Sequence, residues 1–168
     1  CIRDSYCTED LFRTVKPFLD ADGREIYPQD IISFICLSDY NEMYLGLEER
    51  GVAKVDLVSG TVTRLRLSDN PDAPLFVRHI LPYSPEELWI GTESGIVVYN
   101  VRTRRYQHLK SSPYDPYSLS DNAVYSLCKD REGGLWIGSF FGGINYLPQR
   151  NSDFEKYYHT DDPHSLQG

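Results

Sequence analysis

The residues best suited to bind a ligand lie in three short segments, each of which is followed by a glycine. Arg50 and Glu93 are charged and can hydrogen-bond a polar ligand, and Phe140 and Phe141 are adjacent aromatic residues. Exposed aromatic rings stack on sugar rings or anchor a protein partner. These four residues are the predicted ligand-binding residues. The more ordinary interpretation of the two phenylalanines is packing against the neighbouring repeated unit of the fold, because isolated exposed apolar residues are common.

Residues for catalysis or metal binding form no recognisable motif. The sequence has no nucleophile elbow, phosphate-binding loop or metalloprotease helix, and its four histidines are scattered. Asp20–Gly23 resembles the opening of a calcium loop, but its glycine comes two positions early and no glutamate closes the loop. No catalytic residue, metal or cofactor is therefore predicted for this segment. A site completed by parts outside the chain would not be visible here.

The elements that must position the candidate residues are repeated along the chain. Residues 32–46, 77–91 and 124–138 align without gaps, at offsets of 45 and 47 residues. Each of these segments ends in an aromatic residue, an aliphatic residue and a glycine, and a second block with its own glycine follows. Asp115–Leu119 recurs as Asp162–Leu166, which indicates the beginning of a further unit.

Each repeated unit is predicted to form four short strands. In the third unit these are residues 123–129, 135–139, 143–148 and 154–159. No stretch has a sustained 3.6-residue apolar period with caps, so no helix is expected. Units of about 45 residues with four strands have the length of β-propeller blades. The predicted fold class is all-β, with blades of four antiparallel strands in a partial ring of about 3.5 blades.

The repeat divides the chain into five predicted parts. The first part carries an orphan outer strand around residues 12–15, which would close the ring of a complete propeller. Closed propellers have about four to eight blades, so an arc of this length should leave blade faces exposed, and the isolated chain should self-associate or be marginally stable. The parts are the N-terminal segment 1–29, blade 1 over 30–74, blade 2 over 75–121, blade 3 over 122–160 and the start of blade 4 over 161–168.

One column of the repeat predicts aromatic side chains between blades. Trp89 and Trp136 occupy it and should be buried, and the glycine after each lets neighbouring backbone approach closely. Another column holds Cys36 and Cys128. Because these cysteines should lie two blades apart, they are predicted to be buried and unpaired.

Two further cysteines lie outside the repeat. Cys1 and Cys7 are candidates for a local disulfide or for the remnant of a leader, and the sequence leaves both interpretations open.

The charge and hydropathy of the chain argue against several partners. The formal net charge is −8, whereas a protein that binds a nucleic acid backbone needs a basic face. No apolar run approaches the roughly 20 residues that a helix needs to cross a bilayer, and no signal peptide is visible. If the protein is exported, we expect its leader and membrane anchor outside this chain.

Several phrases of the repeat resemble the two-component regulator propeller repeat. The resemblance covers about residues 30–168, and the first unit departs from it with Tyr44 in place of tryptophan. The phrases are Leu88–Thr92 (LWIGT), Gly95–Asn100 (GIVVYN), Asp115–Val124 (DPYSLSDNAV), Gly134–Ser139 (GLWIGS) and Gly142–Tyr146 (GGINY).

The resemblance implies the periplasmic sensor region of a hybrid histidine kinase, a class best known from gut Bacteroidetes. The parent protein would be a homodimer with two propellers, an Ig-like module and a helix in the inner membrane. Its kinase, receiver and DNA-binding parts would be cytoplasmic, and none of these parts is in this chain. Sensors of this family commonly respond to breakdown products of complex glycans, so the resemblance implies an oligosaccharide or another small ligand.

Two other functions stay open on the residues alone. A structural or protein-docking propeller would share this composition, and the sequence that flanks the chain would distinguish such a scaffold from a sensor. A propeller lyase or glycosidase would need acidic, histidine or tyrosine residues that converge at the ring centre, and no such set stands out.

Overall fold

Every regular element that the structure describes is a β-strand. The computed structural model describes residues 6–7, 16–27, 29–38, 41–70, 73–115 and 117–149, and in this part of the chain no helix could span a bilayer. The first sheet contains β3 (Ile32–Leu37), β4 (Glu42–Leu47), β5 (Gly51–Asp56) and β6 (Val62–Arg64). The second contains β7 (Val77–Pro82), β8 (Glu87–Thr92), β9 (Gly95–Asn100) and β10 (Tyr106–Leu109). The third contains β11 (Val124–Lys129), β12 (Leu135–Ser139) and β13 (Ile144–Leu147), and β1 (Tyr6–Cys7) pairs with β2 (Lys16–Pro17).

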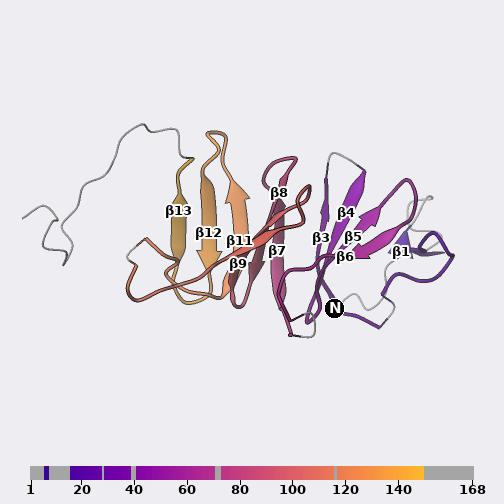
Figure 1. The fold of residues 1–168 in the computed structure, drawn as a ribbon, viewed down its shortest axis with the longest axis horizontal. Helices are drawn as coiled ribbons and strands as arrows, with labels where there is room; N and C mark the ends of the chain where they lie inside the picture. Colours follow the sequence, from indigo (N-terminus) through magenta and orange to yellow (C-terminus); the bar gives the residue numbers. More distant parts are fainter. Residues whose placement is uncertain are drawn as a thin grey trace, which may run out of the picture.

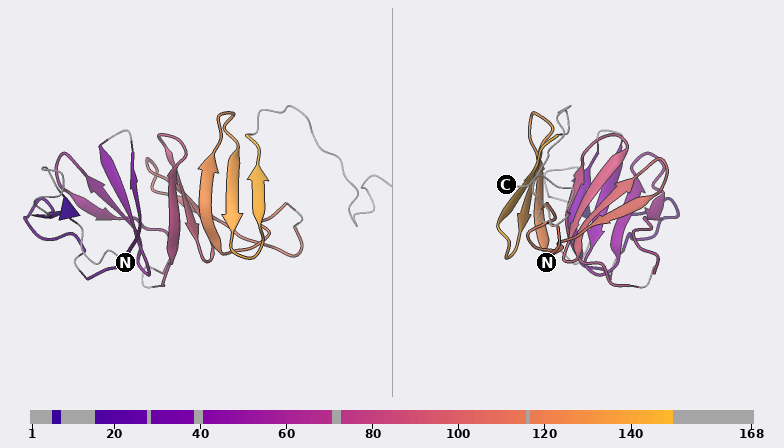
Figure 2. Two further views of the ribbon diagram at one scale, coloured as in Figure 1. Left: turned by 180° about the vertical axis from the view of Figure 1, so that it is seen from behind. Right: turned by 60° about the vertical axis from the view of Figure 1, so that its left-hand side comes forward.

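The three larger sheets are antiparallel meanders, in which each strand pairs with the next strand along the chain. We name them blade 1 (β3–β6), blade 2 (β7–β10) and blade 3 (β11–β13). Figure 1 shows the blades side by side along an arc, and Figure 2 shows the same order from behind. Small antiparallel sheets that succeed one another in this way are the architecture of a β-propeller. The predicted fold class is therefore confirmed.

The first strands of the three blades begin where the aligned segments begin, and β11 is one residue shorter at its start than the predicted strand 123–129. β3, β7 and β11 cover residues 32–37, 77–82 and 124–129. In blade 3, β12 has the predicted bounds, and β13 is one residue shorter at each end than predicted. The outer strands predicted at residues 12–15 and 154–159 lie outside the described residues, as does the start of blade 4. The blade boundaries stay a prediction.

Apolar side chains fill the spaces between neighbouring blades. Leu88 and Ile90 of β8 belong to a buried cluster with Tyr44 of blade 1. Trp89, which lies between them in the sequence, belongs instead to a cluster with Leu135 of blade 3. β8 is therefore buried on both faces, and this explains why its sequence is a continuous apolar run rather than an alternating one.

The N-terminal segment covers part of the other face of blade 1. Ile26 packs in a buried cluster with Leu45 and Val55 of that blade. The backbone N–H of Ala21 donates a hydrogen bond of 3.0 Å to the carbonyl of Gly60, in the turn between β5 and β6. The segment is thus attached to blade 1 through both apolar and backbone contacts.

Trp136 is not buried, and the prediction for this residue is wrong. Its side chain is 45% exposed, whereas Trp89 in the same repeat column is 8% exposed. Blade 3 covers Trp89, but among the described residues no blade lies against the Trp136 face of blade 3. The indole N–H of Trp136 donates to the carboxylate of Asp130 at 3.1 Å, and its ring lies 4.6 Å from that of Tyr146. The tryptophan column is buried only where the next blade covers it.

Cys36 and Cys128 are unpaired, as predicted, but the predicted burial of Cys128 is wrong. Cys36 is partly buried and Cys128 is exposed. Cys128 pairs in register with Trp136, so both side chains lie on the same uncovered face of blade 3. The pairing of Cys1 and Cys7 concerns side chains outside the described residues.

We expect a thiol reagent to modify Cys128 before Cys36 in the native 168-residue chain. Burial raises the pKa of the Cys36 thiol, which lowers its fraction of reactive thiolate, whereas Cys128 is open to solvent. Peptide mapping by mass spectrometry after short pulses of iodoacetamide measures the two rates. The unfolded chain is the reference, in which both cysteines react alike. Faster modification of Cys36 would contradict the difference in burial between the two thiols.

Candidate ligand-binding site

The turns between the second and third strands of each blade lie at one edge of the arc, the lower edge in Figure 1. In each blade a backbone N–H of this turn donates to the carbonyl of the residue just before the first strand. These bonds run from Glu48 to Ile31 (3.0 Å), from Glu93 to Phe76 (3.2 Å) and from Phe140 to Ala123 (2.8 Å). The turns are thereby held beside the beginnings of the first strands.

A β-bulge occurs near the beginning of each first strand. The pairing register with the neighbouring strand shifts at the second residue of β3, β7 and β11. The extra residues are Ser33, Arg78 and Tyr125. Bulges redirect a side chain relative to a regular strand. In blade 1 the Ser33 hydroxyl donates to the carbonyl of Val77 at 2.7 Å, and in blades 2 and 3 the bulged residues reach a turn at the lower edge.

Glu93 accepts hydrogen bonds from two blades. The guanidinium of Arg78 donates to its Oε1 through Nε, at 3.0 Å, and also through Nη2. The hydroxyl of Tyr125 in blade 3 donates to the same oxygen at 3.2 Å. The hydrogen bonds and positive charge of Arg78 lower the pKa of Glu93, so its side chain is a carboxylate at neutral pH. This carboxylate connects blade 2 to blade 3.

The aromatic side chains of blade 3 continue from Tyr125 towards solvent. The ring centroids of Tyr125 and Phe140 lie 5.2 Å apart, and those of Phe140 and Phe141 lie 4.5 Å apart in an edge-to-face arrangement. Phe140 is 60% exposed and Phe141 is 85% exposed. The N–H of Phe141 donates to the carboxylate of Asp121 at 3.0 Å, and this bond lowers the pKa of Asp121. The turn backbone is therefore anchored while the rings face solvent.

Three of the four predicted ligand-binding residues lie in one group, which we name the Tyr125 cluster. Arg50 lies apart from it: its Nη1 is 3.1 Å from the carboxylate of Asp30, and it lines a separate pocket on blade 1. Phe140 packs against Tyr125 of its own blade, which differs from the packing on the neighbouring blade that the ordinary interpretation predicts, and Phe141 projects into solvent. The Tyr125 cluster consists of Arg78, Glu93, Tyr125, Phe140 and Phe141.

Sequence reasoning missed Arg78 and Tyr125, because both belong to strands that were read as buried. The sequence did contain a sign of their different role: each interrupts an apolar strand directly after its first valine, Val77 or Val124. The Tyr125 cluster offers an acceptor carboxylate beside exposed ring faces, which suits noncovalent binding of a ligand with hydroxyl groups and an apolar face. Among the described residues, no three His, Cys, Asp or Glu side chains gather where they could hold a metal ion.

Comparisons with known proteins agree with this architecture. Residues 118–141 match the two-component regulator propeller family. The chain is 32% identical over 99 residues to histidine kinase P4 of Formosa agariphila. That alignment covers 55% of this chain and 7% of the relative, so the chain spans a small part of the length of that protein.

Solved structures show the same fold at low sequence identity. The extracellular domain of BT4673 from B. thetaiotaomicron, assigned to a hybrid two-component system, has a TM-score of 0.63 and 20% identity, over 74% of this chain and 16% of that one. PorZ, a surface component of the type-IX secretion system of Porphyromonas gingivalis, has a TM-score of 0.59 and 18% identity, over 79% of this chain and 19% of that one. Together with the repeat, these likenesses establish that the chain has the fold of β-propeller blades, and residues 118–141 match the two-component regulator propeller family.

Proposed function

We propose that this segment is part of the periplasmic, ligand-sensing propeller of a hybrid two-component histidine kinase. The match to the two-component regulator propeller family supports this function, as do a relative named as a histidine kinase and a structural neighbour that is the extracellular domain of a hybrid two-component system. The segment itself would not be catalytic. The kinase, the membrane anchor and the dimer contacts of the parent would lie in parts outside this chain.

The Tyr125 cluster is the observation that carries the proposal of a glycan-derived ligand. A sugar ring has an apolar face, which stacks on aromatic rings, and a rim of hydroxyl groups, which donate to carboxylates. Phe141, which is 85% exposed, offers such a ring, and the Glu93 carboxylate belongs to the same cluster. A ligand bound here would contact residues of both blade 2 and blade 3. Binding would therefore favour one relative position of these blades, which is what a sensor needs in order to transmit a signal.

The test uses the complete sensor region that contains this chain. We expect calorimetry with a panel of oligosaccharides to identify a bound glycan, and Phe141→Ala to weaken its binding about tenfold, because the stacking surface is lost. Phe140→Ala should weaken binding as well, since Phe140 holds Phe141 in an edge-to-face contact.

Tyr114→Ala is the matched control, because Tyr114 is 95% exposed but lies outside the Tyr125 cluster. This variant should bind the glycan like the unmodified protein. Unchanged binding by both phenylalanine variants would show that the glycan binds elsewhere. Cleavage of the sugar by the unmodified region would replace the sensor function with that of a propeller lyase or glycosidase.

A further inference from the structure

The hydrogen bonds that Glu93 accepts from other side chains all end on one of its two carboxylate oxygens. Nε and Nη2 of Arg78 and the hydroxyl of Tyr125 donate to Oε1. Among the described residues, no group donates to Oε2. Because each oxygen of a carboxylate can accept hydrogen bonds, and the Glu93 side chain is 35% exposed, Oε2 is left as an acceptor for a ligand.

Arg78 and Tyr125 act as positioning residues for this acceptor. Oε1 is held from blade 2 by Arg78 and from blade 3 by Tyr125, so the carboxylate group cannot turn freely. The hydrogen bonds and positive charge of Arg78, with the hydrogen bond from Tyr125, lower the pKa of Glu93. Glu93 therefore stays ionised in mildly acidic solution, and its Oε2 is an oriented and charged acceptor.

The charged side chains that interact with the cluster favour a cationic ligand group. Arg78 is its one basic residue, and Glu93 already opposes that charge. The charge of Glu48, in the turn between β4 and β5, also raises the pKa of the Arg78 guanidinium. Asp121 accepts a hydrogen bond from the backbone N–H of Phe141, which lowers the pKa of its carboxyl group. Three carboxylates thus lie around one guanidinium, and a ligand carboxylate or sulfate would be repelled.

The aromatic rings of the cluster are also suited to a cation. The guanidinium carbon of Arg78 lies 5.3 Å from the centroid of the Tyr125 ring, so one ring of the cluster already contacts a cation. The ring of Phe141 is 85% exposed and is open to a ligand. Ammonium groups are attracted to the faces of aromatic rings, and the apolar face of a sugar stacks on them. A sugar that carries an ammonium group offers both kinds of contact.

We propose that the ligand of the Tyr125 cluster is an oligosaccharide with a protonated amino group, and that Glu93 is the residue that selects it. The ammonium group donates to Oε2 of Glu93 while the sugar ring stacks on Phe141. An ammonium donor forms a stronger hydrogen bond to a carboxylate than a hydroxyl group does, so a neutral sugar binds more weakly. This inference rests on the proposed binding of a glycan by the cluster, and it names the chemical class of that glycan.

The experiment titrates the complete sensor region by calorimetry with disaccharides that share one β-linked backbone. Chitobiose, the disaccharide of glucosamine, is cationic in mildly acidic solution, cellobiose is neutral, and cellobiouronic acid is anionic. At constant ionic strength we expect chitobiose to bind at least about threefold more tightly than cellobiose, and the acidic disaccharide to bind more weakly than cellobiose. A smaller preference for chitobiose, or tighter binding of the acidic disaccharide, would overturn the proposal.

N,N′-diacetylchitobiose tests the role of the charge without any change to the protein. Acetylation keeps the sugar rings and removes the positive charges, so this disaccharide should bind about as weakly as cellobiose. Binding as tight as that of chitobiose would overturn the proposal, because the ammonium group would then contribute nothing.

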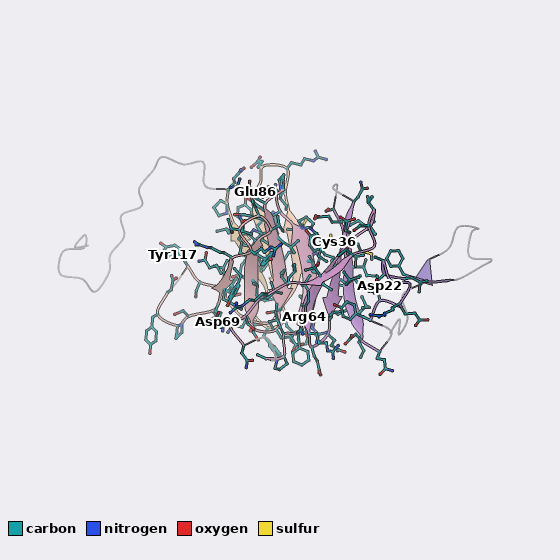
Figure 3. All side chains as sticks on the ribbon, turned by 45° about the vertical axis from the view of Figure 1, so that its right-hand side comes forward. Asp22, Cys36, Arg64, Asp69, Glu86 and Tyr117 are labelled. Carbon is teal, nitrogen blue, oxygen red and sulfur yellow. The ribbon has the colours of Figure 1, made fainter. Side chains whose placement is uncertain are left out.

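Glu93→Gln and a matched control locate the selecting carboxylate. Glu93→Gln keeps an acceptor oxygen but removes the charge, so it should bind chitobiose and cellobiose about equally. Glu86→Gln makes the same change at a glutamate that also pairs with an arginine, Arg102, at 3.4 Å. Figure 3 shows Glu86 at the upper edge of the arc, opposite the edge at which the turns between second and third strands lie, so this variant should keep the preference. A preference that persists in Glu93→Gln, or that is lost equally in Glu86→Gln, would overturn the proposal.

The same titrations separate this proposal from the proposed sensing of glycans. Phe141→Ala should weaken binding of chitobiose and cellobiose alike, because both sugars share the stacking contact. If none of these disaccharides binds, but another oligosaccharide does and Phe141→Ala weakens it, glycan sensing stands and the selection of an amino sugar is wrong. If chitobiose binds and neither Phe141→Ala nor Glu93→Gln changes its affinity, the sugar binds elsewhere and both proposals fail.

Discussion

Replacing Trp89 with alanine is expected to lower the free energy of unfolding of the chain by about 3–5 kcal/mol. The indole is 8% exposed and packs in the cluster between blades 2 and 3, with its ring 5.5 Å from that of Tyr83. Its removal would leave a cavity between blades 2 and 3. The two hydrogen-bonded sheets cannot easily move together to fill that cavity. Urea unfolding followed by circular dichroism measures the loss.

Trp136→Ala is the matched control, because Trp136 occupies the same repeat column on the face of blade 3 that no described blade covers. We expect it to cost about 1 kcal/mol or less, since a side chain that is 45% exposed loses less burial when it is removed. Equal losses in the two variants would show that blade stacking does not stabilise Trp89. If Trp89→Ala does not fold, Trp89→Phe should still show a smaller loss that exceeds that of Trp136→Phe.

The fold was predictable from the sequence because each strand repeats the same local pattern. The ungapped columns that begin at Ile32, Val77 and Val124 specify where each first strand begins, and the structure has these bounds. Burial could not be predicted in the same way. The repeat column specifies the side chain of Trp136, but its burial depends on whether another blade covers it.

The candidate site was predictable in part, for reasons of topology. Glu93 and Phe140 lie in equivalent turns, and the meander places such turns at the same edge of neighbouring blades. Arg78 and Tyr125 were missed because regular alternation does not show where a bulge redirects a side chain. The separation of Arg50 from the Tyr125 cluster could also not be predicted from the sequence, because it depends on the position of its partner, Asp30, in the folded chain.

The second large effect is expected from Gly91→Ala, which should cost about 1–3 kcal/mol of stability, although alanine is otherwise favoured over glycine in a strand by about 0.5–1 kcal/mol. A Cβ at this position would lie 3.0 Å from Cγ1 of Val124 and 3.1 Å from its carbonyl oxygen, in the next blade. Val124 pairs with Ser139 in the sheet of blade 3, so its backbone cannot move without the rest of that blade. The methyl group must therefore push blades 2 and 3 apart, and urea unfolding measures the cost.

Gly138→Ala distinguishes this close approach of two blades from a general cost of alanine at the repeated glycine. Among the described residues, a Cβ on Gly138 would meet only the side-chain hydroxyl of Ser126, which is exposed and can rotate away, and the next of their atoms lies 3.7 Å away. We therefore expect a change within about 0.5 kcal/mol for Gly138→Ala. A loss as large as that of Gly91→Ala would mean that the glycine is required by its own strand. A loss confined to Gly91→Ala would show that the repeated glycine sets the distance between neighbouring blades, which in turn holds Glu93 within reach of Tyr125 across the blade boundary.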